Sequence, residues 1–145
     1  MTGSAFAAAP VPGTSGTRST PSEYQPGICN IGPAEIARRR RAGNVGLVVS
    51  VILLAILVAV SAPPFARLLV ALPAAAAASG YLQAALKFCA GFGSRGPFNF
   101  GPVGPTELAL DPSDRARDGA RARQKGLASL AIGVAVGIVA ALLPL

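Results

Sequence analysis

Three long stretches of this chain carry no charged side chain: residues 42–66, 68–86 and 126–145. A helix rises about 1.5 Å per residue, so about twenty apolar residues cross the hydrocarbon core of a bilayer. Each stretch is long enough to do so. The sequence therefore predicts an all-α integral membrane protein with three transmembrane helices, arranged as a hairpin plus a third span.

The composition supports lipid rather than water as the solvent for these stretches. Hydrophobic residues make up 52% of the chain and charged residues only 13%, about half the charged share usual in a soluble domain. The net charge of +7 is compatible with nucleic-acid binding. The cations flank the apolar runs, however, which is typical of topology signals and of contacts with anionic lipid. We expect the lipid bilayer as a partner and no nucleic acid.

Two other interpretations of the apolar runs stay open at this stage. One is a soluble helical bundle. The other is a cleaved signal peptide, since Val60-Ser61-Ala62 resembles a cleavage site. The first run begins more than forty residues into the chain and exceeds a typical signal-peptide core in length, so a retained span is favoured.

Residues 1–27 are rich in Pro, Gly, Ser, Thr and Ala. Such a segment buries too little apolar surface to offset the entropy of ordering, so we expect a disordered cytoplasmic tail and an ordered chain from about Ile28. Pro33 suits the first position of a helix, and Glu35 would lie in its first turn, where the helix dipole favours an anion.

Residues 28–89 are predicted to form a transmembrane hairpin with spans at about 44–62 and 67–87. Pro63 and Pro64 remove two backbone donors and break the helix. One uninterrupted helix would be about twice the membrane thickness. It would also place Arg67 at mid-bilayer, where the free energy of inserting an arginine is unfavourable by about 2.5–3.5 kcal/mol. The second span is the weaker one, because alanine follows Pro73 five times and inserts less readily than leucine. Pro73 is expected to kink this span or to lie near its start.

The rest of the chain is predicted to supply a loop and a third span. Residues 90–111 read as a Gly/Pro-rich cytoplasmic loop. Asp111 and Pro112 then form a helix-start signal, and residues 112–145 are expected to be a basic juxtamembrane helix leading into a third span at about 126–145. Ser129, Gly133 and Gly137 recur at four-residue spacing. Small residues on one helix face allow close packing, either on the hairpin or on another copy.

The distribution of cations predicts the orientation. Eleven lie either close before the first span, at residues 38–41, or between the second and third spans, and only Arg67 lies on the opposite side. The positive-inside rule then places the N-terminus and the long loop in the cytoplasm and the C-terminus outside. The abundance of Arg, Ala and Gly is typical of a GC-rich bacterial genome, so we expect the inner (plasma) membrane of a bacterium. The residues expected at lipid headgroups are Arg38, Arg39, Arg40, Arg41, Arg121, Arg123 and Lys125.

Few residues suggest chemistry. The chain has no His, the usual general base. No Asp or Glu falls within a predicted span, and no nucleotide-binding or nucleophile motif is present. We therefore expect no enzyme, no cofactor, and no small-molecule substrate that can be inferred.

Cys29 and Cys89 are the candidates that remain. The hairpin would bring both to the cytoplasmic membrane surface, its helix axes about 8–10 Å apart. They could cycle to a disulfide, or supply half of a soft-metal site completed by a second copy. They could equally be small apolar residues that tolerate burial at helix ends. With two cysteines, a secreted scaffold stapled by several disulfides is excluded.

The stretch Cys29-Asn30-Ile31-Gly32, followed by Glu35 and Arg38, resembles the opening of a family of small bacterial inner-membrane hairpins. That family includes the membrane anchor fused to some rhodanese (sulfurtransferase) domains. The resemblance covers about residues 29–100 and continues through Ser79-Gly80-Tyr81, Cys89, Gly96 and Asn99. The chain departs from the family pattern in three ways: Ala90 replaces a Pro, a second closing Cys is missing, and the third span is extra. The resemblance implies a homodimerising hairpin near sulfur chemistry.

The predicted function is that of a small, non-enzymatic integral membrane protein acting by helix packing with itself or with a larger membrane complex. The alternative is a membrane-surface thiol redox or soft-metal protein that uses Cys29 and Cys89.

Overall fold

The computed structural model describes residues 23–144, most of which are helical. Three long helical segments dominate the fold: α1 (Pro33–Ala59), the run of α2 (Pro64–Arg67), η1 (Leu68–Val70) and α3 (Ala71–Ala85), and α5 (Pro112–Leu142). By length and composition, all three are long and apolar enough to cross a membrane. The prediction of a helical fold with three candidate spans is confirmed at this level.

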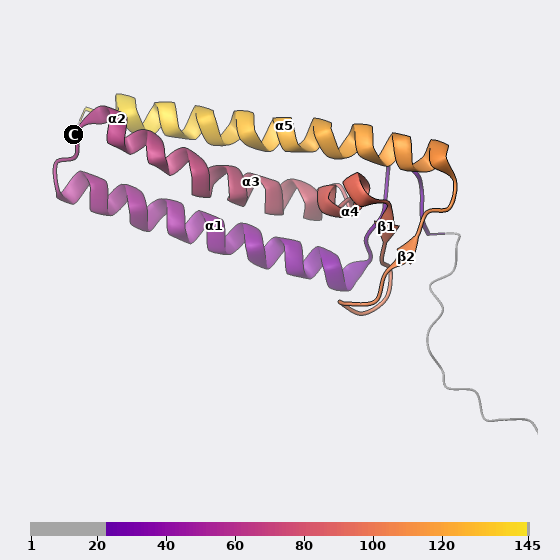
Figure 1. Cartoon of the computed structure of the whole chain (residues 1–145). Helices are drawn as coiled ribbons and strands as arrows, with labels where there is room; N and C mark the ends of the chain where they lie inside the picture. Colours follow the sequence, from indigo (N-terminus) through magenta and orange to yellow (C-terminus); the bar gives the residue numbers. More distant parts are fainter. Residues whose placement is uncertain (1–22, 145) are drawn as a thin grey trace, which may run out of the picture.

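The three segments lie side by side, with α3 between α1 and α5 (Figure 1). Small residues make this close approach possible. A β-carbon added at Gly46 of α1 would come within 2.7 Å of the backbone nitrogen of Ala77 in α3. Gly80 of α3 lies equally tightly against Gly43 of α1. The alanine-rich α3 therefore has a neighbouring helix on two sides, whereas α1 packs mainly on α3.

The proline signals define the helix boundaries. Pro33 is the first residue of α1 and Gly32 is its extended N-cap. The helix α1 ends at Ala59, Ser61 takes a positive φ of 50°, and Pro64 starts α2, as the double proline predicts. Pro73 is the third residue of α3, so it lies near the helix start, where its missing N–H is tolerated.

Residues 90–111, predicted to be a loop, contain regular structure. They form the short helix α4 (Ala90–Arg95) and the antiparallel strands β1 (Pro97–Phe98) and β2 (Glu107–Leu108). Gly96 ends α4 with a φ of 95°. The helix α4 packs on α5, and Gly93 lies against the Phe88 ring. The Gly/Pro-rich composition indicated a loop because the order of this segment comes from packing on α5, which composition does not reveal.

The part of the chain that the structure describes begins before Ile28, the predicted start of order. Residues 1–22 lie outside the described part of the chain, and so does most of the predicted tail. Residues 23–27, assigned to the tail, are described. The Tyr24 ring stacks on Phe98 with 4.5 Å between centroids, and Gln25 pairs with Cys29 through the backbone. These contacts place the start of order before Ile28.

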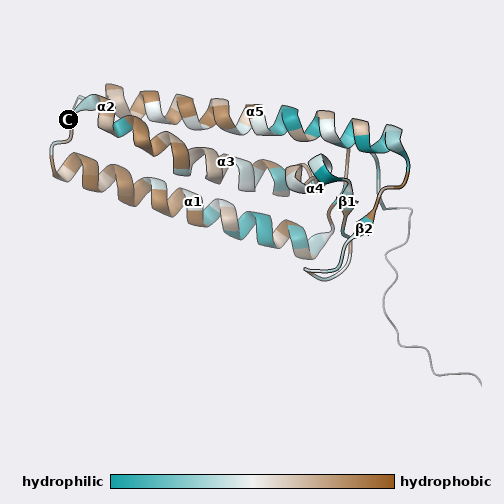
Figure 2. Ribbon diagram, viewed as in Figure 1, coloured by the Kyte–Doolittle hydropathy of each residue, from teal (hydrophilic) through white to brown (hydrophobic). Residues whose placement is uncertain are grey.

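The bundle has one basic and one apolar end, as the teal and brown ends in Figure 2 show. The basic end comprises the start of α1, the α4 region and the first half of α5. Arg67 lies near the opposite end, where its Nη1 donates a hydrogen bond to the carbonyl of Leu143 at 3.0 Å. At the basic end, Asp111 caps α5 by accepting a hydrogen bond from Ser113 N–H at 2.7 Å. Hydrogen bonding to the Ser113 side chain, followed by that to its backbone N–H, holds the pKa of the Asp111 carboxyl below its usual range.

Candidate functional site

The basic end is closed by a network of buried polar side chains, centred on Asn30. Asn30 is fully buried. Its Oδ1 accepts a hydrogen bond from Cys89 N–H at 2.7 Å, and its Nδ2 donates to the Cys89 carbonyl at 3.2 Å. One side chain thus satisfies both backbone groups of Cys89, and this ties the N-terminal segment to the end of the hairpin.

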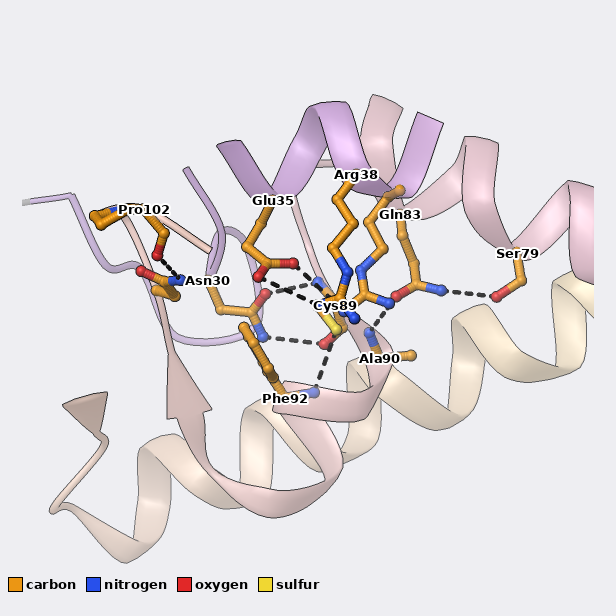
Figure 3. Close-up of polar contacts among 11 residues, drawn as sticks. Asn30, Glu35, Arg38, Ser79, Gln83, Cys89, Ala90, Phe92 and Pro102 are labelled. Atoms are coloured by element: carbon orange, nitrogen blue, oxygen red, sulfur yellow. Dashed lines mark hydrogen bonds and ion pairs between the residues drawn. The ribbon is translucent and has the colours of Figure 1, made fainter. Parts of the chain in front are cut away.

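Cys89 is built into this network. Its side chain is 1% exposed and caps α4, since Sγ accepts a hydrogen bond from Phe92 N–H at 3.4 Å. The next residue, Ala90, donates its N–H to Gln83 Oε1 at 3.0 Å, and Gln83 in turn donates to Ser79 Oγ at 2.7 Å. Figure 3 shows these groups converging from α3, the turn before α4, and the N-terminal segment. Cys89 therefore has a structural role, because its sulfur and its backbone hold the start of α4 in place.

Cys29 occupies a different environment. It is partly exposed, and its Sγ lies 3.9 Å from the carbonyl of Ile31. Both cysteines are free thiols. Both residues lie at the basic end, as the sequence predicted, and no disulfide joins them.

Glu35 is the centre of a cluster of charged side chains at the start of α1. It is 1% exposed, although it lies in the first helical turn. Its carboxylate lies 3.6 Å from Arg38 Nη1 and 3.6 Å from Arg39 Nη2. The Arg39 guanidinium also lies over the Phe92 ring, 5.9 Å from its centroid. Arg39 is thus turned partly inward, whereas Arg38, Arg40 and Arg41 are exposed.

Asp118 ties the N-terminal segment to α5. It is fully buried. It accepts hydrogen bonds from the Tyr24 hydroxyl at 2.8 Å and from Gly27 N–H at 2.6 Å. Burial, followed by the hydrogen bond and charge of Asp118, raises the pKa of Tyr24 well above its usual value.

Lys125 departs from its predicted place at the headgroups. It is only 4% exposed, and its Nζ lies 4.5 Å from the centroid of the Phe88 ring. In the described part of the chain, this Nζ has no hydrogen-bond partner. The other two basic residues predicted on α5 lie further out: Arg123 is exposed, and Arg121 donates a hydrogen bond to Gln124 at 2.7 Å.

A sequence signal could have revealed the burial of Lys125 on α5. The buried residues recur every three or four positions along one face: Asp118, Ala122, Lys125, Ser129, Gly133, Gly137 and Ala140. The buried face that carries Ser129, Gly133 and Gly137 therefore continues toward the basic end. One further step of four residues back from Ser129 reaches Lys125 and would have marked it as buried, whereas Asp118 does not fall on that spacing.

The small-residue stripe itself packs on α3 of the same chain. A β-carbon added at Gly133 would come within 2.5 Å of Ala75 Cβ, and one at Gly137 within 2.8 Å of Ala71 Cβ. Ser129 is buried, and its hydroxyl donates to the Lys125 carbonyl at 2.9 Å. Of the two predicted packing partners, the stripe meets the hairpin.

The described residues contain no group of three or more His, Cys, Asp or Glu side chains that could hold a metal ion. A soft-metal site at Cys29 or Cys89 would need ligands from elsewhere. No protein-family model, curated protein or solved structure matches this chain. The resemblance to the rhodanese-anchor hairpins therefore stays a prediction.

Proposed function

We propose that this is a small, non-enzymatic integral membrane protein of a bacterial inner membrane, acting by helix packing with itself or with a partner complex. The observation that carries the proposal is the large apolar surface left on all three helices. Between 17% and 33% of the residues in each apolar helix window are buried within the chain. In water this surface would drive aggregation, whereas in a bilayer it is solvated by lipid chains or by another helix.

The orientation is part of the same proposal. The basic end would face the cytoplasm and the end carrying Arg67 the opposite side, with the C-terminus outside, because cytoplasmic flanks are enriched in Lys and Arg. The clustering of the remaining cations at one end of the bundle supports this orientation.

The surface available to a partner differs from the one that the sequence suggested. Because α3 occupies the glycine stripe of α5, the outward face of α1 is the better candidate. Its large aliphatic side chains are about half exposed or more, and include Val45, Val48, Val49, Ile52 and Ile56. Their neighbours Gly46 and Ser50 are buried toward α3.

Alkaline carbonate extraction of native membranes tests the membrane assignment, and the protein should stay in the pellet. Its release as a monodisperse species in plain buffer would overturn the proposal. Orientation is tested with a membrane-impermeant maleimide on intact cells. In a Cys29→Ser, Cys89→Ser background, cysteine introduced beside Arg67 should react from outside, and cysteine introduced in residues 101–106 should not.

Cross-linking tests the packing role. A Val48→Cys or Ile52→Cys variant should form cross-links within native membranes, to a second copy or to a partner identified by mass spectrometry. A Ser50→Cys variant is the matched control, because this position is 7% exposed and faces the protein. Equal cross-linking at all three positions would argue against a specific interface on α1.

The second candidate is a membrane-surface thiol redox or soft-metal protein. It is supported by two free thiols at the basic end, of which Cys29 is partly exposed. Mass measurement of the intact, unreduced protein, with and without alkylation, distinguishes this candidate from the first. Two thiols that stay free, metal-free and indifferent to oxidant would exclude it.

A further inference from the structure

We infer that exposed cations at the basic end form a ring that binds the phosphate groups of anionic phospholipids and so enriches these lipids around the protein. This headgroup ring comprises Arg40 and Arg41 of α1, Lys87 between α3 and α4, and Arg123 of α5. The inference rests on the membrane assignment proposed above. It adds to that assignment the class of lipid and the residues that would select it.

The side chains of the headgroup ring have no partners inside the described part of the chain. All four residues are exposed. None of their side chains forms an ion pair or a hydrogen bond within residues 23–144, since the two ion pairs of α1 join Glu35 to Arg38 and to Arg39, at 3.6 Å each. Guanidinium and ammonium groups bind phosphate strongly through charge-assisted hydrogen bonds. These four cations are therefore available to groups outside the chain.

The packing of the three long helices fixes the level of each cation along the bundle axis. Helices α1 and α5 begin at the basic end, whereas α3 ends there (Figure 1). Gly43 of α1 lies against Gly80 of α3, and Gly133 of α5 lies against Ala75 of α3. These two contacts align all three helices, because each residue advances a helix by about 1.5 Å.

Counting from these contacts places the whole headgroup ring within a layer about 8 Å deep. Arg41 and Arg40 lie at its inner side, Arg123 lies next, and Lys87 lies furthest out. The uncharged stretches border this layer, with their limits at residues 42, 86 and 126. The headgroup region on each side of a bilayer is about 5–8 Å deep. The ring therefore has the depth at which lipid phosphates lie, next to the hydrocarbon core.

The acidic side chains that are not buried lie further from the uncharged stretches. They are Glu23, Glu107, Asp111 and Asp114. On α5, Asp114 precedes residue 126 by about 18 Å of helix, and Asp111 lies beyond it. Glu107 is in β2, which lies beyond the start of α1 (Figure 1). Glu23 precedes Tyr24, which Asp118 holds outside the ring. The exposed charges at the headgroup level are therefore of one sign.

A ring of one sign selects lipids by the net charge of their headgroups. A phosphodiester without an amine gains the attraction of the cations, whereas a zwitterionic headgroup brings an ammonium group that the same cations repel. Each Lys or Arg near a membrane surface changes the binding constant for anionic lipid roughly fivefold. We therefore expect phosphatidylglycerol to be preferred over phosphatidylcholine at this end of the bundle.

The test uses the full chain reconstituted in phosphatidylcholine vesicles, with trace spin-labelled phosphatidylglycerol as the anionic probe and spin-labelled phosphatidylcholine as the zwitterionic one. Electron paramagnetic resonance measures the fraction of each probe held at the protein surface. The wild type should prefer phosphatidylglycerol, and this preference should shrink as salt rises. Arg41→Gln and Arg123→Gln should each lower the preference, by up to about fivefold.

Arg117→Gln is the matched control. Arg117 is exposed on the same helix as Arg123 but lies about 9 Å further out, so removing its charge should change the preference less. Arg41→Lys and Arg123→Lys keep the charge and should keep the preference. Unchanged circular dichroism verifies that all of these variants are folded.

The inference is wrong if the wild type shows no preference, or if Arg117→Gln lowers the preference as much as Arg123→Gln does. It is also wrong if soluble inorganic phosphate at equal ionic strength abolishes the preference, because the ring would then bind free phosphate rather than a lipid. In each case the protein would still remain in the pellet after alkaline carbonate extraction. A failure here is therefore distinguishable from a failure of the membrane assignment.

Discussion

Gly133 of α5 lies directly against Ala75 of α3, so closely that a β-carbon on the glycine would come within 2.5 Å of the alanine Cβ. The same β-carbon would lie 2.6 Å from the carbonyl oxygen of Ala71. Backbone cannot move aside as a flexible side chain can. The third helix is therefore held to the hairpin by close backbone approach, in the way small-residue faces join helices in lipid.

Substitution of this glycine should separate α5 from the hairpin. Gly133→Leu introduces a side chain where no space exists, so we expect a loss of about 1–3 kcal/mol in stability, the usual range for overpacking. Thermal unfolding in bicelles, followed by circular dichroism, measures the effect. Gly126→Leu is the control on the same helix, since nothing lies within 4 Å of a β-carbon there. It should be neutral or slightly stabilising, because leucine favours helix over glycine. Equal destabilisation by both variants would argue against the packing explanation.

Asn30→Ala should loosen the basic end. The substitution leaves the N–H and C=O of Cys89 without their side-chain partner, at about 1–3 kcal/mol for an unsatisfied buried group. Cys89 should then react faster with maleimide, and the thermal midpoint should fall. Asn44→Ala is a suitable control, because the hydrogen bond that the Asn44 side chain accepts from the Tyr81 hydroxyl at 2.7 Å is exposed. Unchanged protection of Cys89 in the Asn30 variant would contradict the role given to that network.

The helix boundaries could be predicted from sequence because their signals are local. Pro33, the pair Pro63 and Pro64, and the cap formed by Asp111 and Pro112 act through nearest neighbours along the chain. The closure of the basic end could not be predicted in this way. Asn30 meets Cys89 across 59 residues, and Tyr24 meets Asp118 across 94. Neither pair leaves a periodic pattern in one sequence.

Asp118→Asn should release the N-terminal segment from α5. The neutral amide accepts hydrogen bonds more weakly than the carboxylate that holds Tyr24 and Gly27. Hydrogen exchange should therefore rise in residues 24–31. The pKa of Tyr24 should fall toward its ordinary value, which phenolate absorbance would detect in a Tyr81→Phe background. Asp114→Asn is the control, as its charge has the smallest influence on Tyr24. If exchange stays unchanged in the Asp118 variant, the segment is held by other contacts.

The raised pKa of Tyr24 also predicts a pH dependence. A group with a higher pKa in the folded chain than in the unfolded one stabilises the fold fully below the unfolded value, about 10 for tyrosine. This stabilisation is lost as the pH rises above that value. Unfolding midpoints measured from about pH 8 to about pH 11, a range that spans the ordinary tyrosine pKa, should fall more steeply for the wild type than for Tyr24→Phe. Parallel curves would show that the contact contributes no pH-dependent stability.

Arg67→Met should fray the end of α5 at the far side of the bundle. The variant loses the charged hydrogen bond from Nη1 to the Leu143 carbonyl, and such bonds contribute about 1.5–3 kcal/mol. Amide exchange in residues 139–143 should accelerate about tenfold, corresponding to the lower end of that range. Arg95→Met, at an exposed position at the basic end, should leave this region unchanged.

The position of α3 between its two neighbours bears on how the chain would insert into a membrane, as proposed above. An alanine-rich segment is a poor candidate to leave the insertion machinery alone, since alanine contributes little to partitioning into lipid. One side of α3 packs on α1, which is synthesised before it, and the other side packs on α5, which is synthesised after it. We expect α3 to insert into the bilayer together with α1. The side of α3 that packs on α5 would then lack its partner until α5 has been synthesised. Loss of α5 would then expose a newly made hairpin to membrane quality control.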